Sequence, residues 1–229
     1  MKRIGIIAAM QEEMNAIKEI MESAYSNTIY ELEFIEGKIN DKECVLVQCG
    51  VGKVNSSRVT QVMIDKYDIE YVINVGSAGT ANQELQIGDI VIGKTLVQHD
   101  FDITAFGHKK GYISNVGEKL QSDAELINKF EECILNLNLS EYKVKIGTIA
   151  SGDIFCTEEW MKQKINAKFN ADAIEMEGAA IAQVCYLDKV PFIVIRSISD
   201  SPNGNNNITF EKYLELASKR CSEIIKKVI

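Results

Sequence analysis

The sequence predicts an α/β fold with a mixed, mostly parallel twisted central sheet flanked by helices. Short apolar runs of strand length alternate with helical apolar patterns along the chain. The 229 residues suffice for one sizeable core, and the two prolines and fifteen unclustered glycines mark no interdomain linker. We therefore expect residues 1–229 to form a single domain.

In the first part of the chain, apolar runs indicate strands and apolar residues at helical spacing indicate helices. The expected order is strand 3–9, helix 12–22, strand 29–39, strand 44–48, helix 53–67, strand 71–75 and strand 90–97. The first helix carries Met14, Ile17 and Met21 at helical spacing. The turn signal Asn40-Asp41 joins the second and third strands into a hairpin-like pair.

The second part continues the alternation after an irregular stretch through His99 and Gly111. The expected elements are helix 123–137, strand 144–150, helix 158–169, strand 173–176, helix 178–187, strand 192–199, polar loop 201–207 and helix 210–228. Strands that alternate with helices pack as a largely parallel sheet, so the carboxyl ends of these strands are expected to meet at one edge.

Composition excludes several classes of function. The net charge of −8 disfavours nucleic acid or an anionic membrane as a partner. No segment approaches the roughly 18 apolar residues of a membrane helix, and the apolar run near the N-terminus is too short for a signal peptide. Six cysteines without a CxxC pair and only two histidines favour reduced thiols in the cytoplasm. We expect no metal and no cofactor.

The sequence does not match two common glycine-containing motifs. The segment 50–53 (GVGK) resembles part of a phosphate-binding loop, but Val47 and Val54 stand where that motif requires Gly and Ser or Thr. Around Ser77, Val75 occupies the place of the first glycine of a nucleophile elbow.

Carboxylates at strand ends are the stronger signal. Glu13 follows the first strand, Glu177 follows the strand at 173–176, and Asp200 follows the strand at 192–199. Each one alone is compatible with a helix cap, a turn or a solvated first turn. Their convergence at one sheet edge favours a site that uses carboxylates for acid and base chemistry.

Seven segments, in order along nearly the whole chain, resemble the 5′-methylthioadenosine/S-adenosylhomocysteine nucleosidase family. They are residues 5–13 (GIIAAMQEE), 50–54 (GVGKV), 74–79 (NVGSAG), 99–107 (HDFDITAFG), 151–155 (SGDIF), 175–177 (EME) and 196–200 (RSISD). The resemblance implies a nucleoside phosphorylase-like fold, a homodimer, and an N-ribosyl hydrolase that releases adenine from methylthioadenosine, S-adenosylhomocysteine and 5′-deoxyadenosine.

The resemblance also implies roles for individual residues. Glu13 is the expected base that activates water, and Asp200 is the expected acid at adenine N7. The implied substrate-binding residues are Ser77 and Arg196 at the water, Glu177 at the ribose hydroxyls, Phe155 and Cys156 at the base, Met10, Val51, Met176 and Phe210 at the ribose and 5′ group, Gly79 and Ser199, and Ile103 and Phe106 of the partner subunit.

The chemistry explains why a proton donor is needed. Adenine leaves poorly as an anion, so an acid must protonate N7 while positive charge develops on the ribose. A free aspartate has a pKa of about 3.9. We therefore expect burial or the hydrogen bond to N7 to raise the pKa of Asp200.

The chain departs from the family pattern at two places. Cys156 stands where the family often has an aliphatic residue, and 201–204 (SPNG) replaces a small, acidic stretch. Only the backbone of residue 156 is expected to contact the base, so base recognition should survive. The loop 201–207 leaves the preferred 5′-substituent open, including futalosine-type nucleosides.

Two other functions remain to be weighed. A phosphate-dependent purine nucleoside phosphorylase shares the fold but needs arginines for phosphate, and this chain has four arginines in all, at 3, 58, 196 and 220. At two places expected to bind phosphate it has Glu12-Glu13 and Asn74. A non-catalytic nucleoside sensor would have no use for an acid pair at 13 and 200.

Overall fold

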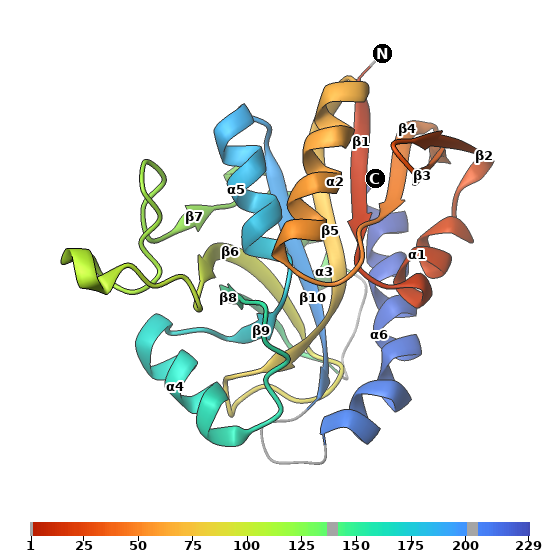
Figure 1. Cartoon of the computed structure of the whole chain (residues 1–229). Coiled ribbons are helices and arrows are strands. Elements are labelled where there is room, and N and C mark those ends of the chain that lie inside the picture. The colour runs from red at the N-terminus through yellow and green to blue at the C-terminus, as the bar shows by residue number, and fades with distance from the viewer. Residues whose placement is uncertain (1, 137–141, 201–205) are drawn as a thin grey trace.

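The computed structural model describes residues 2–136, 142–200 and 206–229, without the side chains of 206–212. Its strands join into one twisted mixed sheet with helices on both faces (Figure 1). This arrangement confirms the predicted α/β fold class.

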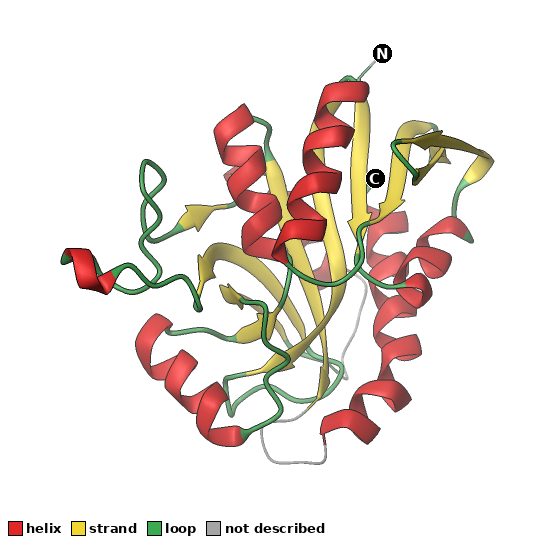
Figure 2. Cartoon of the chain, in the orientation of Figure 1, coloured by secondary structure: helices red, strands yellow, loops and turns green. Residues whose placement is uncertain are grey.

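The described elements follow the expected alternation of strands and helices (Figure 2). The strands are β1 (Arg3–Ala8), β2 (Glu22–Ile29), β3 (Leu32–Ile39), β4 (Lys42–Gln48), β5 (Ile69–Thr80), β6 (Ile90–Gln98), β7 (Leu120–Gln121), β8 (Val144–Ser151), β9 (Ala173–Glu175) and β10 (Phe192–Asp200). The helices are α1 (Gln11–Lys18), α2 (Lys53–Lys66), the short 3-10 helix η1 (Thr104–Phe106), α3 (Ala124–Asn136), α4 (Glu159–Phe169), α5 (Gly178–Asp188) and α6 (Asn206–Val228).

Strand β5 is the hub of the sheet. Its first part lies between β1 and β10, and both neighbours run parallel to it. Its last residues, Gly79 and Thr80, pair with β9. Because β10 also pairs with β6, β6 with β8 and β8 with β9, these strands close into a ring with β5. The antiparallel strands β3 and β2 extend the sheet beyond β4 on the other side.

Successive side chains of the central strands point to opposite faces of the sheet, and each face carries a hydrophobic core. Ile6 and Ile73 belong to the core shared with α1, α3 and α6. Their neighbours Ile7 and Val72 belong to the core shared with α2 and α5. A strand with both faces covered needs apolar residues at successive positions, which explains the continuous apolar runs in the sequence.

Helix α1 and strand β2 differ from the sequence prediction. Helix α1 ends at Lys18, whereas the apolar pattern suggested a helix through Glu22. Ile20 and Met21 lie in tight turns after the helix and pack against the core, so they continue the helical spacing without continuing the helix. Strand β2 gave no strand signal because it is a largely exposed edge strand without alternating burial.

The end of β5 also differs. The sequence suggested that the strand stops at Val75, but it continues through 76–80 because these residues pair with β10 and β9. The glycines at this end are therefore part of the sheet.

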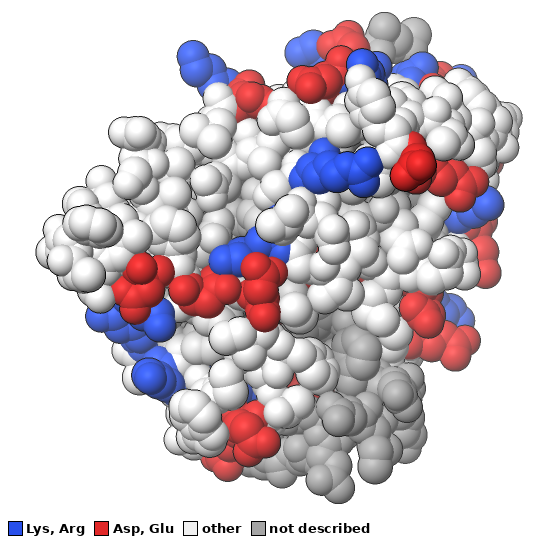
Figure 3. Space-filling view, viewed as in Figure 1, with Lys and Arg blue, Asp and Glu red and all other residues white. Residues whose placement is uncertain are grey.

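On the face shown in Figure 3, acidic and basic side chains are scattered among wide uncharged areas. None of the helices in the described parts of the chain is long and apolar enough to cross a membrane.

Candidate active site

A cavity of about 420 Å³ lies at the carboxyl ends of β1, β5 and β10, a size that suits a small organic ligand. The segments that follow β8 and β9 complete its wall. The lining residues are Ala9, Met10, Glu13, Val51, Ser77, Ala78, Gly79, Ile154, Phe155, Cys156, Ile174, Glu175, Met176, Glu177, Arg196 and Asp200. Glu13 and Asp200 therefore open onto the same cavity.

Glu13 is fixed by backbone groups from two strand ends. It lies in the first turn of α1, and its Oε2 accepts hydrogen bonds from the amides of Ala9 (3.0 Å) and Met10 (3.1 Å). Its Oε1 accepts from the amide (2.9 Å) and the hydroxyl (3.3 Å) of Ser77. With its side chain buried and both oxygens held, the carboxylate has a defined position at the cavity.

Asp200 ends β10, next to an irregularity in the sheet. Ile198 pairs with Ala78 and Asp200 with Gly79, so Ser199 is an extra residue in β10. Such bulges redirect the side chains that follow them. Burial raises the pKa of Asp200, and the neighbouring ammonium of Lys162, 2.6 Å from Oδ2, acts in the opposite direction.

Two glycines of β5 make room for these acids. A Cβ atom on Gly76 would lie 2.7 Å from Oε1 of Glu13, and one on Gly79 would lie 2.9 and 3.0 Å from the two carboxyl oxygens of Asp200. Real Cβ atoms essentially never approach other heavy atoms so closely. The backbone of β5 thus touches both carboxyl groups.

Arg196 anchors a second group of charges. Its Nη2 donates to Asn74 Oδ1 (2.6 Å) and to Glu175 Oε2, and lies 3.9 Å from Glu177. Although burial acts to raise it, the pKa of Glu175 is lowered by Arg196 and by the hydroxyl of Ser151. Glu175 is therefore the main counter-ion of Arg196.

The pKa of Glu177 is shifted in the opposite direction from that of Glu175. Burial and the charge of Glu175 raise its pKa, although Arg196 and the amide of Gly52, which donates to Oε1 at 2.9 Å, act against the shift. A buried carboxyl without a full counter-ion is suited to hydrogen-bond neutral hydroxyl groups of a ligand.

The segment after β8 supplies an aromatic wall. The side chain of Phe155 is 48% exposed although it lines the cavity, so part of the ring is available to a ligand. Cys156, next to it, is buried. An open aromatic face in a cavity can stack on a heterocyclic base.

Most predicted site residues meet at this cavity: Met10, Glu13, Val51, Ser77, Gly79, Phe155, Cys156, Met176, Glu177, Arg196 and Asp200. Ile103 and Phe106 do not line it. Ser199 is buried and donates to the carbonyl of Ala78 (3.4 Å) without lining the cavity. The side chain of Phe210 lies outside the described residues.

Sequence reasoning missed several residues. Glu175 lies within the segment 175–177, but the sequence indicates no role for it, and nothing in the sequence distinguishes Lys162 from other lysines. A single lysine in an amphipathic helix normally reads as a solvated residue, so the sequence gave no signal for its burial. The apolar residues Ala9, Ala78, Ile154 and Ile174 were missed because any buried strand end has such residues.

Comparison with known proteins agrees with this geometry. Residues 3–229 match the phosphorylase superfamily. A 5′-methylthioadenosine/S-adenosylhomocysteine nucleosidase of Staphylococcus haemolyticus is 41% identical over 99% of this chain and 98% of its own length. The chain belongs to this nucleosidase family.

Solved structures agree with the family. The nucleosidase of Neisseria meningitidis in complex with methylthio-immucillin-A is 33% identical, with a TM-score of 0.95 over 100% of this chain and 98% of that one. A futalosine hydrolase of Helicobacter pylori is 32% identical, with a TM-score of 0.94 over 99% of this chain and 97% of that one. The resemblance and the nucleoside phosphorylase-like fold predicted from the sequence are thus confirmed.

The contact between Gly79 and Asp200 gives a prediction. In Gly79→Ala the new methyl group displaces the Asp200 carboxyl, and a misplacement of about 1 Å can cost about a hundredfold in rate. We expect kcat for adenine release to fall by about this factor, with a melting temperature close to that of the wild type. Wild-type turnover in Gly79→Ala would show that the position of Asp200 is unimportant.

Proposed function

We propose that this chain hydrolyses the N-glycosidic bond of 5′-methylthioadenosine and S-adenosylhomocysteine, and of 5′-deoxyadenosine, to adenine and the 5′-substituted ribose. One observation carries this function: Glu13 and Asp200 line the same cavity, whose volume suits a nucleoside. The full-length similarity to nucleosidases supports the choice of substrates.

In the proposed reaction the two carboxyl groups have opposite tasks. Asp200 donates its proton to N7, so adenine leaves as a neutral base when the bond from C1′ to N9 breaks. Glu13 takes a proton from water as the water oxygen bonds to C1′, and its charge stabilises the positive ribose. Both groups are buried at the cavity, where such electrostatic effects are stronger than in water.

The remaining lining residues position the substrate in this proposal. Phe155 stacks on the adenine, the backbone of Cys156 pairs with the edge of the base, and Glu177 accepts the ribose hydroxyls. Ser77 and Arg196 help to hold the water, since Ser77 already contacts Glu13 and Arg196 lies against the same strand.

A phosphorylase is less well supported. Among the described residues Arg196 is the one arginine that lines the cavity, and its guanidinium is engaged by Glu175 and Asn74. Glu13 and Glu175 line the same cavity and would repel a phosphate ion.

We predict that methylthioadenosine releases adenine at the same rate with and without phosphate. The measurement is product chromatography with methylthioadenosine, S-adenosylhomocysteine, 5′-deoxyadenosine and a futalosine-type nucleoside. A strict requirement for phosphate would favour the phosphorylase. Cleavage of the futalosine-type nucleoside alone would reassign the substrate within the same chemistry.

We also predict that Glu13→Gln and Asp200→Asn each lower kcat by about 10² to 10⁴, the range typical of a general acid or base. Neither amide can perform the proton transfer of the acid that it replaces. Calorimetry should show that Glu13→Gln keeps most of its affinity for a substrate analogue. The matched control is Glu12→Gln, because Glu12 is exposed and next in sequence. Unchanged turnover in either test variant would remove that residue from its role.

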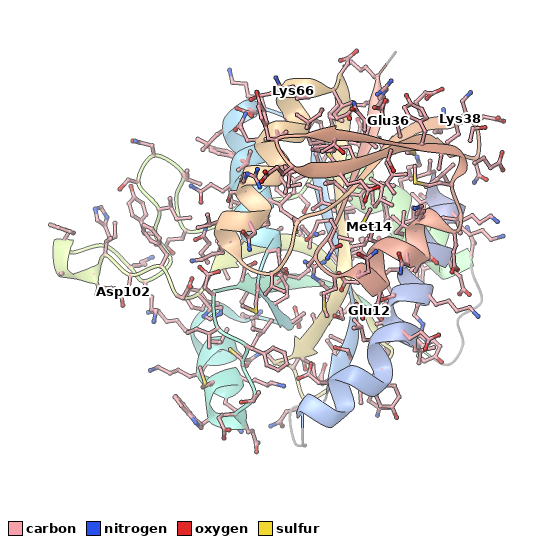
Figure 4. The ribbon with its side chains drawn as sticks, turned by 45° about the vertical axis from the view of Figure 1, so that its right-hand side comes forward. Glu12, Met14, Glu36, Lys38, Lys66 and Asp102 are labelled. Atoms are coloured by element: carbon pink, nitrogen blue, oxygen red, sulfur yellow. The ribbon has the colours of Figure 1, made fainter. Side chains whose placement is uncertain are left out.

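We further propose that the chain is a homodimer whose partner completes the 5′ pocket. The segment that carries η1, on which Asp102 is labelled, projects from the body of the molecule (Figure 4). Phe106, in η1, is 82% exposed, and Val54 of α2 and Tyr186 and Leu187 of α5 are further exposed large apolar residues. Large apolar side chains exposed in this way suit contact with a second copy of the chain. We propose a cytoplasmic location and a role in methionine salvage.

The dimer gives its own prediction. Light scattering should show a dimer, and Phe106→Ala should raise KM for methylthioadenosine about tenfold, the loss of roughly 1.4 kcal/mol of apolar contact. Leu135→Ala is the control, since Leu135 is an exposed apolar residue of α3, which covers the opposite face of the sheet from α2 and α5. A monomer with full activity would refute this arrangement.

A further inference from the structure

Lys162 forms a buried ion pair with Asp200. Its Nζ lies 2.6 Å from Oδ2, and the two residues are 1% and 2% exposed. Lys162 belongs to α4, which packs against β8. It does not line the cavity, so it reaches a ligand only through Asp200.

The burial of Lys162 is unusual for its residue type. Lysine is almost never fully buried unless it is paired, because removing an ammonium group from water is costly. Other lysines of the same helix, Lys164 and Lys168, are exposed. An apolar residue facing the core would avoid this cost, so the pair calls for an explanation in terms of Asp200.

We propose that Lys162 is a positioning residue that holds Oδ2 of Asp200, leaves Oδ1 to face N7 of the base, and strengthens Asp200 as an acid. The inference rests on the proposed function, since it assumes that Asp200 donates the proton. An ammonium at 2.6 Å stabilises the carboxylate that remains after the proton has moved to the base.

The surroundings of Asp200 make Lys162 the dominant charge. Lys162 faces Asp200 from α4, and Gly79, which has no titratable side chain, faces it from β5. Cys156, in the segment after β8, also faces Asp200, and burial raises the pKa of its thiol. Glu13 and Glu177 line the same cavity, but the charge that shifts the pKa of Asp200 is that of Lys162. The side chains of 206–212 lie outside this description.

The effect on pH dependence has a definite sign. A general acid works while it is protonated, so its loss of a proton produces the alkaline limb of the kcat/KM profile. A cation next to the acid lowers its pKa, by 1 to 3 units for a close pair. Removing the cation raises the pKa of Asp200 and therefore moves the alkaline limb to higher pH.

The first experiment is the pH profile of Lys162→Met and Lys162→Gln. Met keeps the length of the side chain without its charge, and Gln keeps a hydrogen-bond donor without its charge. We expect both to move the alkaline limb upward by about 1 to 3 pH units and to lower the plateau of kcat. Lys164→Met, an exposed lysine of the same helix, should leave the profile unchanged. A lower rate with an unmoved limb in both Lys162 variants would indicate a merely structural role and overturn the inference.

A second experiment does not depend on activity. The Asp200 carboxyl is titrated by ¹³C NMR in the wild type and in Lys162→Met, with its signal assigned by its loss in Asp200→Asn. We expect the Asp200 midpoint to be higher in Lys162→Met by about 1 to 3 pH units. Equal midpoints would refute the inference even if the wild type cleaves methylthioadenosine. If the wild type releases no adenine, the proposed function fails and with it the acid role, whatever the titration shows.

Thermal melting separates a charge effect from a packing effect. Asp200→Asn removes the negative charge of Asp200 from beside the buried ammonium of Lys162, which is destabilising. Asp200→Asn combined with Lys162→Met removes both charges and should melt at a higher temperature than Asp200→Asn alone. A double variant that is no more stable would show that the two charges do not compensate each other.

Discussion

Two positions of β5 have no room for a side chain, and the arrangement of the cavity depends on them. The backbone at Gly76 lies against Glu13, and the backbone at Gly79 lies against Asp200. The same strand pairs with β1, which leads to Glu13, and with β10, which ends at Asp200. One strand thus sets the positions of both carboxyl groups, and the hydrogen bonds of the sheet make that spacing stiff.

Charge balance is the second constraint on the site. The described lining contains four carboxyl groups, at 13, 175, 177 and 200, and one guanidinium, at Arg196. Each carboxyl has a different environment: backbone and hydroxyl donors at Glu13, a close Arg196 at Glu175, the amide of Gly52 and a more distant Arg196 at Glu177, and Lys162 at Asp200. Different neighbours therefore suit one residue type to the proposed tasks of base, hydroxyl acceptor and acid, and to that of counter-ion, within one cavity.

The sequence predicted the fold class from local pattern, and it predicted most of the cavity wall from strand ends together with the resemblance to the nucleosidase family. Apolar runs located the central strands, and strand ends located Glu13, Glu177 and Asp200. It did not predict the continuation of β5 through its glycines, since that depends on pairing with distant β10. It missed Lys162 for the same reason: Lys162 and Asp200 are 38 positions apart, and only the tertiary fold shows that α4 turns a lysine inward.

The cavity has two kinds of wall. Glu13 and Asp200 are attached to the ends of regular elements, whereas Val51, Ile154 and Phe155 lie in connecting segments. Connecting segments tolerate replacement better than core strands do. Evolution can therefore reshape what the pocket accepts by changing its loops, while the two carboxyl groups proposed to transfer protons keep the positions that the sheet gives them.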